Sequence, residues 1–193
     1  MIDYALLDTL PEWAAVRETY EKWHTLMQEQ ITFSHEASEI HTKAHCARVI
    51  CYALLIAARL GLDADAMDVL GAAGAFHDCR RQDDGPDVGH GARAATAYRE
   101  HCRTHDLPHY DERVAQIMTY HDLDDTRGEQ VLSGSDLLLY RVFKDADALD
   151  RWRLGPKGLD PAYLRTEPAR ELVEFSKQLT GVADAPPESP FSA

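Results

Sequence analysis

The chain has 193 residues, 45% of them hydrophobic, and a formal net charge of −13. This length and apolar content suffice for one domain with a buried core, and no apolar run reaches the roughly 18 residues that a membrane span needs. The negative charge argues against long nucleic acid as a partner. The acidic first residues lack a basic leader segment, so we expect a cytoplasmic protein without a membrane partner.

Helical periodicity accounts for most of the chain. The predicted helices cover residues 11–30, 40–60, 63–77, 89–101, 111–121, 133–152 and 168–180, with a helical turn at 161–164. The third helix is rich in Ala and Gly, which favours close packing at the centre of a bundle. Two polar, turn-rich segments, 79–88 and 122–135, are predicted to be loops.

The fold class that follows is all-α. Strand patterns are few and no internal repeat is present, so we predict a single helical domain over residues 1–181. The last residues, 182–193, are rich in Pro, Ser and Ala and are predicted to be a disordered tail. None of the four cysteines forms a CxxC pair, and we expect free thiols.

A spaced set of histidines and aspartates is the main functional signal. Its members are His45, His77, Asp78, His90, His121 and Asp147. Imidazole nitrogens and carboxylate oxygens bind divalent transition metals such as Zn²⁺, Mn²⁺ and Fe²⁺. Most of the set falls on predicted helices, so several helices could direct ligands into one core, as in metal sites of helical bundles.

The order of these residues resembles the HD-domain metal-dependent phosphohydrolase superfamily. The matching segments are HCARV with His45, AFHDCRR with His77 and Asp78, and KDADALD with Asp147. Asp147 is preferred to Asp145 because the residues after it fit the family pattern. The resemblance covers residues 40–152 and implies a helical bundle of the HD-domain type with these four residues as its metal ligands.

Two further histidines extend the resemblance. His90 in GHGARAA and His121 in IMTYHD match members that hold two ions, Mn, Fe or similar, bridged by Asp78. The alternative is one ion, with His90 and His121 as an acid or as substrate contacts. Similar segments occur in bacterial enzymes that cleave dinucleoside polyphosphates. The chain departs from the cyclic-di-GMP phosphodiesterases because it has Tyr120 before His121 and no GYP signature.

Basic residues near the ligands are candidate phosphate contacts. Arg81 lies three residues after Asp78, where many members of the superfamily have Lys or Arg. A guanidinium can bind two phosphate oxygens at once through two hydrogen bonds. Arg80 and Arg48 are weaker candidates, since each could instead form an ordinary surface ion pair. Asp145 and Asp150 are expected to hold a His or an Arg rather than to bind metal.

Other residues near the set are weaker candidates. Asp122 is a candidate acceptor of a hydrogen bond from an imidazole, or a candidate metal ligand. His41 is a candidate to orient a ligand, although a partly exposed helical histidine is the simpler interpretation.

The resemblance implies a metal-dependent phosphohydrolase that acts on a phosphate ester or anhydride of a nucleotide-like small molecule through a metal-activated water. Catalytic roles are expected for Asp78, Arg81, His90 and His121. A minority of the superfamily are di-iron oxygenases that cleave C–C or C–P bonds with the same six ligands, which is the alternative. A non-catalytic ligand-binding domain is a third interpretation. The sequence leaves the oligomeric state open.

Overall fold

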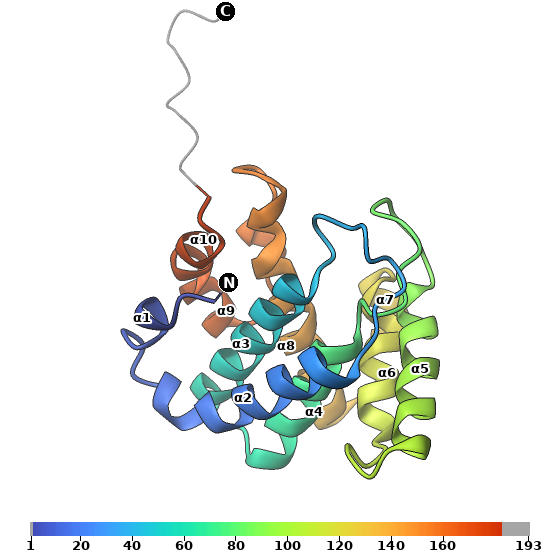
Figure 1. Ribbon diagram of the computed structural model, residues 1–193. Coiled ribbons are helices and arrows are strands. Elements are labelled where there is room, and N and C mark those ends of the chain that lie inside the picture. The colour runs from blue at the N-terminus through green and yellow to red at the C-terminus, as the bar shows by residue number, and fades with distance from the viewer. Residues whose placement is uncertain (1, 183–193) are drawn as a thin grey trace, which may run out of the picture.

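All regular structure in residues 2–182, which the computed structural model describes, is helical (Figure 1). The elements are α1 (Tyr4–Leu7), α2 (Trp13–Gln30), α3 (Lys43–Arg59), α4 (Ala64–Phe76), α5 (His90–Thr104), α6 (Glu112–His121), α7 (Asp125–Glu129), α8 (Gly134–Leu149), η1 (Asp150–Leu154), η2 (Pro161–Tyr163), α9 (Glu167–Glu171) and α10 (Val173–Thr180). The all-α prediction is confirmed. The predicted tail lies outside the described residues, apart from Val182.

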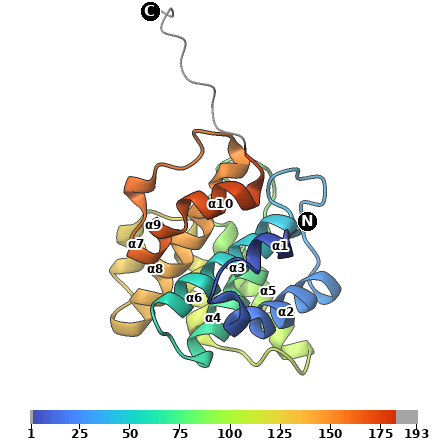
Figure 2. The ribbon, with the colours of Figure 1, turned by 90° about the vertical axis from the view of Figure 1, so that its left-hand side faces the viewer.

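Helix α3 is the centre of the fold. Its residues are buried from His45 to Ala57, with the exception of Arg48. The helix is therefore covered on nearly all sides, as a core helix is. It packs against α4, α8 and α2, while α5 and α6 form a pair on one side and α1, α9 and α10 lie on the other (Figures 1 and 2). Despite this apolar centre, no helix in residues 2–182 is both long and apolar enough to cross a bilayer.

Small residues let α4 approach its neighbours closely, as its composition predicts. A Cβ atom on Gly71 would lie 2.2 Å from the Trp23 ring, and one on Gly74 would lie 2.7 Å from Ile50. Larger side chains at either position would push α2 or α3 away. The Ala- and Gly-rich sequence therefore fixes α4 against both helices, and with it the His-Asp pair at its end.

Several elements differ from the predicted ones, among them α3, α7 and the C-terminal helix. Helix α3 begins at Lys43 rather than at residue 40, because the Thr42 side chain accepts a hydrogen bond from the backbone N–H of His45 and caps the helix. Helix α7 lies inside the predicted loop 122–135, where Asp124 caps a helix too short to show periodicity. The predicted final helix is divided at Leu172 into α9 and α10.

Candidate metal centre

Five helix ends bring the six predicted ligands together. The side chains come from the first turn of α3 (His45), the end of α4 (His77 and Asp78), the start of α5 (His90), the end of α6 (His121) and the last turn of α8 (Asp147). All are buried except Asp147, whose side chain is 31% exposed. The cluster therefore has one open side, next to Asp147.

Each of the four imidazoles is held through its Nδ1 atom. The acceptors are Asp150 Oδ2 for His45 (2.7 Å), Gly74 O for His77 (2.9 Å), Asp87 O for His90 (2.9 Å) and Met118 O for His121 (2.7 Å). Carbonyl and carboxylate oxygens only accept hydrogen bonds, so Nδ1 carries the proton in each ring. In the neutral rings every Nε2 atom is left with a free lone pair.

These Nε2 atoms face one another in two pairs. The distance is 3.2 Å between His45 and His77 and 2.9 Å between His90 and His121. Two lone pairs at such distances repel unless a cation or a proton lies between or beside them. Converging unprotonated imidazoles, each oriented from behind by a second group, are the arrangement that holds a metal ion.

The Asp78 carboxylate lies between the two imidazole pairs. Its Oδ2 is 3.5 Å from His45 Nε2 and 3.9 Å from His77 Nε2, whereas its Oδ1 is 3.1 Å from His90 Nε2 and 3.9 Å from His121 Nε2. Each oxygen therefore serves a different pair. A carboxylate placed in this way can bridge two ions, one on each side.

Asp147 completes the side occupied by His45 and His77. Its Oδ1 is 3.4 Å from His45 Nε2, and ligand atoms of these three residues all lie within 4.8 Å of one another. His77, Asp78 and His121 form a second such group. Buried His and Asp groups at this site could thus hold metal ions.

Burial and neighbouring charges give most of the ligands the ionisation that metal binding requires. Burial lowers the pKa of His77 to about 3, and burial together with the nearby His90 lowers that of His121. Burial alone would raise the pKa values of Asp78 and Asp147, but the surrounding histidines hold both well below the usual range. At neutral pH, His77 and His121 are therefore neutral imidazoles, and Asp78 and Asp147 are ionised carboxylates.

His45 and His90 behave differently. Burial would lower the pKa of each ring, but hydrogen bonds from His45 to Asp147 and Asp150, and from His90 to Asp78, outweigh it and raise the pKa. A proton on either ring would occupy the lone pair that a metal needs. Protons and metal ions therefore compete at these two positions.

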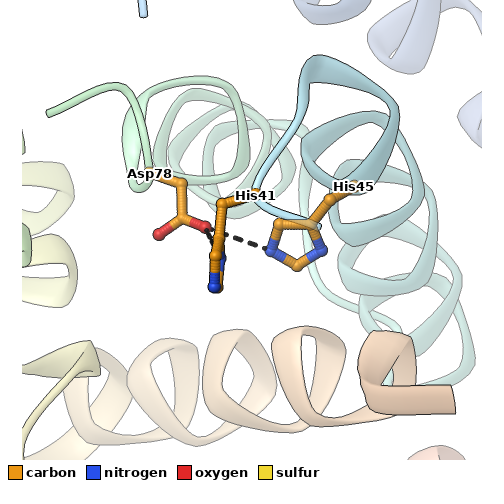
Figure 3. A group of neighbouring side chains, drawn as sticks. All are labelled: His41, His45 and Asp78. Carbon is orange, nitrogen blue, oxygen red and sulfur yellow. Dashed lines mark hydrogen bonds and ion pairs between the residues drawn. The ribbon is translucent and has the colours of Figure 1, made fainter. Parts of the chain in front are cut away.

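His41 also belongs to the cluster, although it was not among the predicted ligands. Its Nδ1 lies 2.8 Å from Asp78 Oδ2, and its ring and that of His45 converge on this carboxylate (Figure 3). It precedes α3, so it does not share a helical face with His45. The four-residue spacing alone could not reveal this contact, which depends on the loop before the helix.

Asp150 holds His45 from behind, as predicted for a residue that supports a ligand. Its carboxylate accepts from His45 Nδ1 and also from Nε and Nη2 of Arg48, at 2.5 and 3.0 Å. Arg48, a predicted substrate contact, is therefore placed behind the cluster and paired with Asp150. It is absent from the residues that line the hollow beside the ligands.

Arg81 lies at the cluster, but most of its hydrogen-bonding capacity is used within the protein. Its Nη1 is 3.8 Å from Asp78 Oδ1, whereas Nε and Nη2 donate to the carbonyls of Asp83 and Gly85. The side chain thereby fixes the loop after α4. Its guanidinium still borders the hollow beside the ligands, so its predicted contact with substrate stays a prediction.

Arg80 and Asp145 lie away from the ligands. Arg80 donates to the carbonyls of Thr32 and Cys79 and borders a different hollow from the one beside the cluster. Asp145 is fully buried and accepts hydrogen bonds from Arg165 and Thr166. It holds an arginine, as predicted, but on the side of α8 that faces the C-terminal segment.

Gly91 allows the close approach of α5 and α6 that pairs His90 with His121. A Cβ atom there would lie 2.1 Å from the Met118 carbonyl oxygen and 2.8 Å from His121 Nδ1. We expect Gly91→Ala to cost about 1–3 kcal/mol in the free energy of unfolding and to weaken metal binding, because His121 must move. Thermal unfolding and metal titration measure both effects.

Gly85→Ala is the matched control, because its new Cβ would approach only the end of the Asp83 side chain, at 3.0 Å. If Gly91→Ala had the same melting temperature and the same metal affinity as the wild type, the close contact between α5 and α6 would be contradicted.

Comparisons with known proteins add no family assignment. No family model matches the chain, and no curated protein or solved structure matches it significantly. Any function must therefore be inferred from the His/Asp cluster and from the hollow beside it.

Proposed function

We propose that the chain is a metal-dependent phosphohydrolase of the HD-domain type. The observation that supports this proposal most directly is the position of Asp78. Its two oxygens face two separate pairs of converging imidazole nitrogens. The ligand order that resembles the superfamily in sequence is thus also a spatial cluster at one end of a helical domain. Asp147 adds a further carboxylate on the open side.

The residues present fit two divalent ions of the Mn or Fe type. His45, His77 and Asp147 would hold one, His90 and His121 the other, with Asp78 between them. Such ions supply Lewis-acid activation of water and of a phosphoryl oxygen. His41 and Asp150 orient Asp78 and His45 through hydrogen bonds of 2.8 and 2.7 Å, which keeps the ligands in place.

The hollow beside the cluster suits a small anionic substrate. It has a volume of about 300 Å³ and is bordered by three arginines and by four of the six predicted ligands. The three are Arg81, Arg151 and Arg153. Four aspartates also border it, namely Asp78, Asp84, Asp122 and Asp147. Divalent ions at the cluster would offset these carboxylates, and the arginines would then favour a phosphorylated molecule. Arg81, fixed beside Asp78, would lie where charge develops on a transferring phosphoryl group.

The test is phosphate or nucleotide release by the purified chain with added Mn²⁺. The substrates are nucleoside mono-, di- and triphosphates, dinucleoside polyphosphates and sugar phosphates. We expect turnover of at least one class. The proposal is overturned if every substrate is inert while the protein carries iron with a mixed-valent EPR signal and consumes O₂ with a substrate, because the same ligand types would then serve an oxygenase.

Metal binding itself should stabilise the fold. An ion that binds only the native state adds RT ln(1 + [M]/Kd), or about 2.7 kcal/mol at a concentration of one hundred times Kd. We therefore expect Mn²⁺ to raise the melting temperature and a chelator to reverse the rise. Because His45 and His90 have raised pKa values, the rise should shrink as the pH falls and these rings are protonated.

Substitution of the central carboxylate, Asp78→Asn, is the comparison, since it removes the shared ligand. An equal rise in melting temperature with this variant would mean that Mn²⁺ binds elsewhere.

A further inference from the structure

A second, larger hollow adjoins the one beside the ligands. The second has a volume of about 620 Å³ and shares one wall with the first. The shared residues are Pro86, His90, His121, Asp122, Asp147 and Arg151. We call the second hollow the annex; its outer wall is formed by residues 157–165, beyond the segment that resembles the HD superfamily. His90, His121 and Asp147 of the cluster thus border both hollows, which places the annex next to a molecule bound at the cluster.

Cationic side chains are concentrated in the annex of this acidic protein. Four of them border it, against three aspartates. The cations are Lys144, Arg151, Lys157 and Arg165, and the aspartates are Asp122, Asp147 and Asp160. A divalent ion at the cluster would offset the charge of Asp147, which leaves the annex more positive still. With such an ion bound, the exposed Arg151 on the shared wall would favour an oxyanion over a cation or a neutral molecule.

Two of the cations are built into the structure. The Lys144 ammonium donates to the carbonyls of His121 and Leu123, and Arg165 pairs with Asp125 and Asp145. Lys144 also lies 3.1 Å from Asp125 Oδ1. Carboxylates therefore offset much of the charge of these two cations, which are held in place. They have few donors left for a ligand.

Arg151 differs from both, because it is anchored at one atom only. It lies one helical turn after Asp147, on the wall between the two hollows, and is exposed. Its Nε donates to the Gly158 carbonyl at 2.9 Å. Within residues 2–182, neither Nη atom has a hydrogen-bond partner. A guanidinium oriented at Nε with two free donors is prepared to bind an oxyanion in a bidentate manner.

We propose that the annex binds a second anionic group of the substrate and that Arg151 is its principal contact. The inference rests on the proposed function, since it assigns the cleaved phosphate to the ligand cluster. It narrows the substrate class to molecules that carry a further phosphate beyond the one at the cluster. Compounds with a single phosphate would use the first hollow alone.

The binding test uses inorganic polyanions and needs no turnover. The full chain is titrated calorimetrically with tripolyphosphate and, separately, with inorganic phosphate. We expect tripolyphosphate to bind more tightly, and Arg151→Ala to weaken its binding about tenfold, the effect of losing a charge-assisted contact. Arg141→Ala is the matched control, because this arginine of α8 pairs with Glu129 and borders neither hollow.

The kinetic test compares substrates of different charge. Arg151→Ala should raise KM about tenfold more for a nucleoside triphosphate than for p-nitrophenyl phosphate, which has one phosphate. Equal tripolyphosphate affinities of the wild type and Arg151→Ala would overturn the annex proposal even if phosphate release is normal. Tripolyphosphate binding that depends on Arg151, without any phosphate release, would support the annex and reject the hydrolase instead.

Discussion

Replacing Asp78 with asparagine is expected to lower metal-dependent phosphate release by roughly 10³-fold, the loss of about 4 kcal/mol of transition-state stabilisation. Asparagine has nearly the same shape but no negative charge, and only one oxygen to offer. In the wild type each carboxylate oxygen faces a different imidazole pair. The variant should lose the bridge between the two sides while its far-ultraviolet circular dichroism stays that of a helical protein.

The control for this substitution is Asp106→Asn, an exposed position in the segment between α5 and α6. It makes the same chemical change far from the cluster and should retain wild-type turnover. If Asp78→Asn keeps more than about a tenth of the wild-type rate, a loss of less than about 1.4 kcal/mol, the cluster is not where the reaction takes place. Metal content measured on the same samples separates loss of the ions from loss of chemistry.

The sequence located this cluster because its members lie at the ends of strongly periodic helices. His45 follows the capped start of α3 and His77 follows the last turn of α4, so helical pattern and residue type together predict that they meet. The Ala- and Gly-rich stretch of α4 further indicated a central helix. The resemblance of His90 and His121 to members that hold two ions comes from the sequence, whereas the opposite orientations of the two Asp78 oxygens are defined only by the packed helices.

Contacts made by loops were beyond the reach of periodicity. His41 meets Asp78 because Thr42 caps α3 and leaves His41 in the preceding loop. Arg48 was a plausible substrate contact in sequence, but its partner, Asp150, lies 102 positions away. Arg151 was not among the predicted site residues, because the annex that it borders forms only when residues 157–165 pack beside it. Such tertiary contacts have no local signature.

Asp150→Ala should have a large effect on stability. The carboxylate is fully buried and is shared by His45 and Arg48. Its removal leaves the Arg48 guanidinium, whose side chain is only 15% exposed, without its charge partner. Breaking a buried pair in this way costs about 3–5 kcal/mol. His45 also loses the acceptor that fixes its tautomer, and metal affinity should fall by roughly 10- to 100-fold. Chemical denaturation and metal titration measure the two effects.

Asp145→Ala separates these two consequences. Asp145 is also a fully buried carboxylate paired with an arginine, Arg165, but it contacts no imidazole of the cluster. The Asp145→Ala substitution should therefore destabilise the fold to a comparable degree, while metal affinity in the folded protein stays near the wild-type value. If both variants lose metal affinity equally, the effect of Asp150 is general loosening of the fold. A loss confined to Asp150→Ala would assign to this residue the specific task of orienting His45 toward the metal.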